Sequence, residues 1–161
     1  AIIGLLAPKD VMSRYKQMSI EAFNIFSMRP DPWRKHLLLR DLDEHNILVN
    51  EKKAKTHLVD TEDSHGGNIA FDLAWLSSRL FLADNPNKIA NFFIPEVHNL
   101  IKAIDLTGSN HTIKLYNALV ARNLIAIAIN PRFWPPKSHQ VSRLRWLNRV
   151  WSLSNELYQG C

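Results

Sequence analysis

Three short apolar runs follow one another between Leu37 and Val59, and each is too short to form a helix. The runs are 37–39, 47–49 and 57–59. A polar loop, 40–46, separates the first two, and a charged, turn-like segment, 50–55, separates the last two. Short apolar runs bounded by turn residues are typical of buried strands. The pattern therefore predicts three short buried strands, the last two paired as a hairpin.

The rest of the chain has the pattern of helices. Apolar residues recur every three to four positions over 10–28, until the sequence RPDP ends the pattern. Further helices are predicted over 71–83, 86–93, 95–104, 109–129 and 138–157. Pro86 and Pro95 each open one of them, a position that favours proline. A helix, a few short strands and then more helices predict an α+β fold in which helices dominate.

The composition is that of a folded domain. The chain has 161 residues, of which 46% are hydrophobic and 22% charged, so one domain with a real core is expected and disorder is not. Cys161 is the single cysteine, which excludes an internal disulfide and a cysteine-based zinc site. Since Arg122 and Asn123 interrupt the most apolar segment, no membrane span is predicted. No signal peptide is predicted either, and a cytoplasmic protein is expected.

The net charge of +5 implies attraction to anions, such as a nucleotide, a nucleic acid or an anionic membrane surface. Charge alone does not choose among them. Binding to nucleic acid rests on this feature only and is not expected.

The polar residues that follow the short strands are of the kinds that phosphoryl transfer uses. That reaction needs metal ions held against phosphates and a carboxylate that receives the proton of the acceptor hydroxyl. Asp41 lies in the loop after the first run, Asn46 follows it by five residues, and Asp60 directly follows the third run. Oxygen ligands of this kind suit Mg²⁺, with waters and phosphates completing its coordination.

These segments, read as RDLDEHNILV, VDTED and FDLAWL, resemble the catalytic core of the aminoglycoside phosphotransferase/choline kinase-like family. That family's motifs run roughly HGDLxxxNILV, VIDFED and a helix with FDLA. The resemblance implies that Asp41 is the catalytic base and that Asn46 and Asp60 bind Mg²⁺ and, through it, ATP. It also implies that Asp72 supports the catalytic loop from the following helix, and that the fold is the C-terminal lobe of a protein-kinase-like domain.

Two departures from the family pattern bear on the function. Leu39 stands where the family has a histidine, and only 40 residues precede Asp41, with Gly4 as their sole glycine. We therefore expect residues 1–161 to be a single domain, the catalytic lobe. The nucleotide-binding N-terminal lobe would come from a longer form of the same chain or from another chain.

The function expected on this basis is ATP- and Mg²⁺-dependent phosphorylation of a hydroxyl on a small molecule or sugar. The alternative is a catalytically inactive, kinase-like interaction module. Simpler interpretations also remain for single residues: Asp41, Asp43 and Glu44 as a solvated acidic turn, and Asp60 as a turn cap.

Other notable residues receive structural interpretations. None of the seven histidines has the spacing of a metal site. Gly66 and Gly67 are predicted to let the metal-binding loop turn. The last helix carries three arginines and two tryptophans, Arg143, Arg145, Arg149, Trp146 and Trp151. They form either a contact for an anionic acceptor or membrane headgroups, or a core-facing tryptophan pair with a solvated basic edge, which we favour.

Overall fold

The computed structural model describes residues 8–28, 36–39, 42, 44–62, 64–83, 89–104, 109–130 and 140–159. Its helices are α1 (Pro8–Ser27), α2 (Ala70–Ala83), α4 (Ile94–Ile104), α5 (Ser109–Ile129) and α6 (Gln140–Gln159). Its strands are β1 (His36–Leu38), β2 (Ile47–Asn50), β3 (Lys55–Leu58) and β4 (His65–Gly67). The predicted class, a mostly helical α+β fold, is confirmed.

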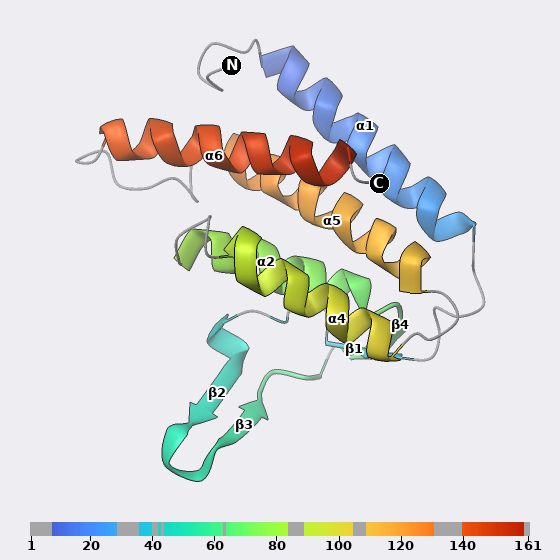
Figure 1. Ribbon diagram of the computed structural model, residues 1–161, viewed down its shortest axis with the longest axis vertical. Helices are drawn as coiled ribbons and strands as arrows, with labels where there is room; N and C mark the ends of the chain where they lie inside the picture. Colours follow the sequence, from blue (N-terminus) through green and yellow to red (C-terminus); the bar gives the residue numbers. More distant parts are fainter. Residues whose placement is uncertain are drawn as a thin grey trace.

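Helix α5 forms the centre of the domain, and α1, α2, α4 and α6 all pack against it (Figure 1). Its side chains are buried on nearly every side, including Leu115, Tyr116, Val120 and Leu124, which are fully enclosed. Among the described residues α5 alone has the length and hydropathy of a membrane span, but 72% of that window is buried inside the domain. The helix is thus apolar all round because neighbouring helices surround it.

Helix α1 covers one side of α5 with a narrow apolar stripe. Val11, Met18, Ala22 and Ile25 are buried at spacings of three, four and seven residues, as one helical face requires. His111 of α5 lies 2.7 Å from the carbonyl oxygen of Ile25 and adds a polar contact to this interface. The helix predicted over 10–28 is therefore present and begins slightly earlier.

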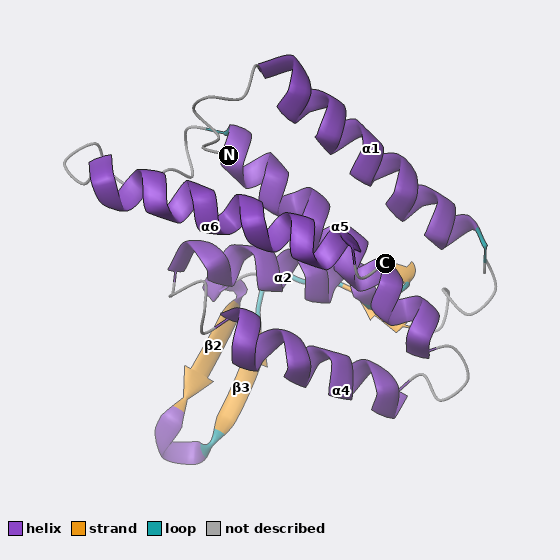
Figure 2. Ribbon diagram, turned by 45° about the horizontal axis from the view of Figure 1, so that its top comes forward, coloured by secondary structure: helices purple, strands orange, loops and turns teal. Residues whose placement is uncertain are grey.

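The strands form two separate antiparallel pairs. β2 pairs with β3 through the register Ile47↔Leu58, and the predicted hairpin is confirmed. The predicted burial of its strands is wrong, because every residue of the two strands except the partly buried Ile47 is exposed. A 3-10 turn, η4 (Glu51–Lys53), connects these strands, and Ala54 after it has a left-handed φ of 47°. The hairpin extends away from the helices (Figure 2). β1 pairs with β4. In the sequence, β1 precedes the hairpin and β4 follows it.

Strand β4 was not predicted, because the glycines in it were interpreted as turn residues. In the structure Gly66 and Gly67 pair with β1, and no described glycine has a positive φ. A Cβ atom on Gly67 would come within 2.9 Å of Leu38 Cγ. The glycine therefore lets the buried Leu38 side chain pack closely over the neighbouring strand.

The chain before α4 also differs from expectation. Instead of a separate helix up to Phe93, a π-helical turn, η5 (Ile89–Phe93), leads directly into α4, which begins at Ile94. Pro86 lies outside the described residues. Pro95 is the second residue of α4. Because proline has no backbone N–H, it cannot donate an α-helical hydrogen bond to the preceding turn. The two predicted helices are thus one continuous segment over the described part.

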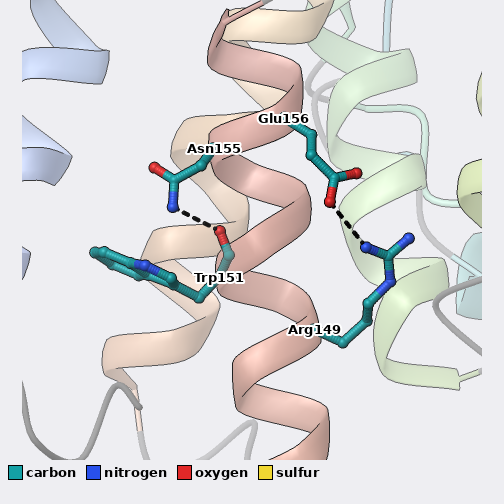
Figure 3. Close-up of polar contacts among 4 residues, drawn as sticks. All are labelled: Arg149, Trp151, Asn155 and Glu156. Atoms are coloured by element: carbon teal, nitrogen blue, oxygen red, sulfur yellow. Dashed lines mark hydrogen bonds and ion pairs between the residues drawn. The ribbon is translucent and has the colours of Figure 1, made fainter. Parts of the chain in front are cut away.

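Helix α6 presents its tryptophans to the core. Trp146 and Trp151 pack against the buried cluster, and Trp146 Nε1 donates to the carbonyl oxygen of Phe81 at 3.3 Å. On the other side of α6 from Trp151, Arg149 forms an ion pair of 3.0 Å with Glu156 (Figure 3). The tryptophan contacts agree with the favoured interpretation of a core-facing pair. For the basic edge, Arg145 is exposed and Arg149 is partly buried, whereas the Arg143 side chain lies outside the described residues. Contact with a membrane remains a prediction.

A buried polar contact joins α2 to α5. The hydroxyl groups of Ser77 and Tyr116 lie 2.7 Å apart, and Ser77 also donates to the carbonyl oxygen of Leu73 at 2.6 Å. The ring of His98, from α4, meets the Tyr116 ring edge-on with centroids 5.5 Å apart. Burial raises the pKa of Tyr116 above its ordinary value, and the hydrogen bond with Ser77 opposes this to a smaller extent.

The burial of Tyr116 predicts that its contribution to the free energy of unfolding depends on pH. At high pH the unfolded chain loses the Tyr116 proton near the ordinary pKa of about 10, whereas the folded chain retains it. The contribution is therefore complete below about pH 9 and declines as pH rises further. Tyr116→Phe should cost about 1 kcal/mol near neutrality and progressively less above about pH 10. Urea unfolding of both proteins across this range measures the difference, and a constant difference would contradict the prediction.

Candidate functional site

The nested pairing of the strands brings two loops together. β1 pairs with β4 and β2 pairs with β3, so the segment from β1 to β2 and the segment from β3 to β4 leave the same end of the hairpin. Asn46 lies in the first segment and Asp60 in the second. The two expected Mg²⁺ ligands therefore lie in two neighbouring loops, one ligand in each loop.

A backbone hydrogen bond fixes the relative position of these loops. The N–H of Val59 donates to the carbonyl oxygen of Asn46 at 3.0 Å, which extends the pairing by one step beyond Ile47 and Leu58. Residue 46 is consequently held opposite residue 59, and Asp60 is the next residue along. The short 3-10 turn η3 (Glu44–Asn46) leads directly into β2, so Asn46 is the residue immediately before that strand.

Asp60 has an unusual backbone conformation. Its φ of 57° lies in the left-handed region, a feature that it shares, among described non-glycine residues, only with Ala54 at the tip of the hairpin. Aspartate tolerates this region better than most residues, but the conformation still has a cost. Such residues cluster at functional sites, where the surrounding structure holds them. The Asp60 side chain is exposed, so it is accessible to a ligand.

Asp72 connects helix α2 to the segment ahead of the loop. Its side chain is only 4% exposed, and its Oδ2 accepts the backbone N–H of Leu39 at 2.6 Å. A buried carboxylate needs such donors to offset the loss of water. Asn68 caps the same helix by accepting the N–H of Ala70 at 2.7 Å, which fixes the first turn where Asp72 lies.

The contact with Leu39 uses only backbone atoms of that residue. Leucine in place of the family's histidine is therefore compatible with this anchor. Asp41 itself lies outside the described residues, as do Arg40 and Asp43. Its predicted role as catalytic base stays a prediction.

The described residues suit Mg²⁺ better than a transition metal. Among them, no group of three or more histidine, cysteine, aspartate or glutamate side chains could hold a metal ion. Asn46 and Asp60 supply one amide oxygen and one carboxylate, both hard oxygen donors. Mg²⁺ commonly binds through one or two carboxylates while waters and phosphates fill its other positions. The exposure of Asp60 leaves room for those further ligands.

A cavity of about 500 Å³ lies on the inner side of the β1–β4 pair. Its walls come from α1, β1, β4, the start of α2 and the second half of α5, and include Phe26, Leu38, Gly67, Asp72, Trp75 and Arg122. The sequence analysis did not identify it, because its lining is drawn from distant segments. The available signals were polar residues inside apolar helices: Asp72 in α2, and Arg122 with Asn123 in α5.

Comparisons with protein-family models, with curated proteins and with solved structures found no match. The resemblance described above therefore rests on the three motifs and enters the functional assignment as a proposal.

The anchor predicts a local change on substitution of Asp72. Asp72→Ala removes the acceptor of the Leu39 N–H and should cost about 1.5–3 kcal/mol, the range for a hydrogen bond to a charged group. Hydrogen exchange measured by NMR should show faster exchange of the Leu39 amide. Glu62→Ala, at an exposed carboxylate, is the matched control and should change neither quantity. Unchanged protection of Leu39 in Asp72→Ala would contradict the assigned contact.

Proposed function

We propose that this chain is the catalytic lobe of an ATP- and Mg²⁺-dependent phosphotransferase that acts on a hydroxyl of a small molecule or sugar. The carrying observation is the backbone pairing that holds Asn46 beside the Val59–Asp60 segment. The Asp72 contact, which anchors the chain two residues before Asp41, supports it further. The resemblance to the aminoglycoside phosphotransferase/choline kinase-like family, within a protein-kinase-like fold, belongs to the same proposal.

The proposed roles follow from the reaction. Asp41 accepts the proton of the acceptor hydroxyl as its oxygen bonds to the γ-phosphorus and the bond from that phosphorus to ADP breaks. Asn46 and Asp60 hold the metal ion. When bound, Mg²⁺ neutralises charge that develops on the phosphates. Asp72 of α2 holds the backbone of Leu39, two residues before Asp41, in a fixed position.

The surface of the hairpin supports the presence of a second lobe. Val49 and Leu58 share one face of the hairpin and are 65% and 47% exposed, and Leu48, on the opposite face, is 53% exposed. The hairpin therefore has an apolar surface that is unusual on a strand pair facing water. We propose that a nucleotide-binding lobe, from the same or another chain, covers it. The same surface also favours the second candidate, a kinase-like interaction module without catalysis. Turnover distinguishes the two.

The acceptor is proposed by class only: an aminoglycoside, a choline-like or homoserine-like alcohol, or a lipopolysaccharide core sugar. The net charge of +5 disfavours a polycationic acceptor, which an acidic pocket would bind better.

Substitution of the metal ligands tests the proposal. In the protein with both lobes, Asp60→Asn should abolish phosphoryl transfer to any member of an acceptor panel, because it removes the only proposed carboxylate ligand. Asn46→Ala should have a similar effect. Since Asp60 is exposed, thermal unfolding should be nearly unchanged, and Glu62→Gln serves as the control for loss of a nearby negative charge. Undiminished turnover in Asp60→Asn would refute the metal-site assignment.

Substitution of Asp41 tests the proposed base. Asp41→Asn should lower kcat by about 10²–10⁴-fold, the usual range for a general base, with little change in nucleotide affinity. Steady-state kinetics and nucleotide titration of the two-lobe protein measure both quantities. Loss of nucleotide binding with normal turnover of the bound fraction would show that Asp41 has a different role.

A further inference from the structure

The cavity beside α2 and α5 adjoins a second hollow. A smaller space of about 250 Å³ lies towards α1 and is lined by Ser19, Ala22 and Phe23 as well as by residues of the larger cavity. Phe26, Phe71, Leu119 and Arg122 line both spaces. The rings of Phe26 and Phe71 meet edge-on with centroids 5.6 Å apart. The two hollows therefore adjoin across these shared side chains, and they are together called the elongated cavity.

The walls of the larger cavity are mainly apolar and aromatic. Leu38, Trp75, Leu119 and Ala126 face it along with the two phenylalanines. A volume of about 500 Å³ is within the range of sites that enclose small organic ligands, roughly 300–1,000 Å³. Such sites combine an apolar lining with a few polar groups that orient the ligand.

Arg122 is the positive group common to both hollows. Its Nη2 donates to the Tyr15 hydroxyl at 3.0 Å, and its Nη1 donates to Asn123 Oδ1 at 3.3 Å. The guanidinium carbon also lies 5.5 Å from the centroid of the Tyr15 ring. All these partners are neutral, and within the described residues no carboxylate pairs with Arg122. A guanidinium stays charged and has five N–H donors, so Arg122 retains donors for an anion.

Of the described lining residues, Asp72 is the one carboxylate, and it is not bonded to Arg122. Asp72 lines only the larger hollow, and its Oδ2 is bonded to the N–H of Leu39. His65, from β4, also lines only the larger hollow among the described residues. A partly buried arginine surrounded by aromatic rings and neutral hydrogen-bond partners is typical of a site for a negatively charged ligand.

From these observations we propose that the elongated cavity binds a small amphipathic anion, with a carboxylate-like group on Arg122 and an apolar body along Phe26, Phe71 and Trp75. This site is separate from the hairpin residues proposed to hold Mg²⁺. It would exist whether or not the chain catalyses phosphoryl transfer.

The test uses decanoate as the probe and decanol as its uncharged counterpart, each titrated into the ¹⁵N-labelled chain. NMR should show decanoate binding with a Kd at or below about 1 mM, near what its size supports. Amide shifts should concentrate on Gly66, Gly67 and Ala126, which line the cavity. Decanol should shift the same amides more weakly.

Two variants distinguish the contribution of the Arg122 charge to ligand binding from that of the cavity volume. Arg122→Met should weaken decanoate binding about 10- to 100-fold, as expected for a lost charge-assisted bond, and leave decanol binding unchanged. Ala126→Phe should fill the cavity and remove binding of both probes. Arg149→Met removes an arginine outside the lining and is the matched control, with no expected effect.

Three results would overturn the proposal. The first is no decanoate binding at millimolar concentration. The second is shifts that map away from the cavity. The third is equal affinity for decanoate in the original chain and Arg122→Met, with the fold of each variant verified by circular dichroism. None of these outcomes depends on ATP or turnover, so the phosphotransferase proposal is tested independently.

Discussion

A buried carboxylate connects the helical core to the loop region that follows β1. Asp72 belongs to α2, which packs directly on the central helix α5, and it accepts a hydrogen bond from Leu39 at the start of the loop region. Because the loops contain few buried apolar side chains of their own, they need such an anchor to have a fixed position. Packing of the helices stabilises the domain, and the position of the loop region depends on its attachment to these helices through Asp72.

The enclosed helical body and the exposed β2–β3 hairpin differ in how they are held in the fold. Helix α5 is enclosed on almost every side, and α1, α2, α4 and α6 bury their apolar faces on it. The β2–β3 hairpin extends from this body with its residues exposed, and Asn46 and Asp60 lie at its base. Backbone pairing thus fixes the end of the hairpin next to the helices, while the Asp60 side chain there stays exposed.

Much of this could be predicted from periodicity. The amphipathic spacing of α1, the apolar α5 and the hairpin from Ile47 to Leu58 all have strong local signals, and the structure contains each of them. Strand β4 could not be predicted, since Gly66 and Gly67 have low strand propensity and the close approach of Gly67 to Leu38 arises only in the folded chain. The cavity was also hidden, because residues such as Phe26 and Arg122 approach each other only in the folded chain. The motif residues were found from their order along the sequence, and their chemical roles stay predictions.

Paramagnetic broadening by Mn²⁺ is the most direct measurement of whether the base of the hairpin is a metal site. Mn²⁺ accepts the same oxygen ligands as Mg²⁺ and broadens NMR signals of nearby nuclei. The pairing of Asn46 with Val59 predicts selective broadening of amides around residues 46 and 59–62, and its loss in Asp60→Asn. Broadening centred elsewhere, such as on Glu51 at the hairpin tip, or broadening that persists in Asp60→Asn, would contradict the assignment.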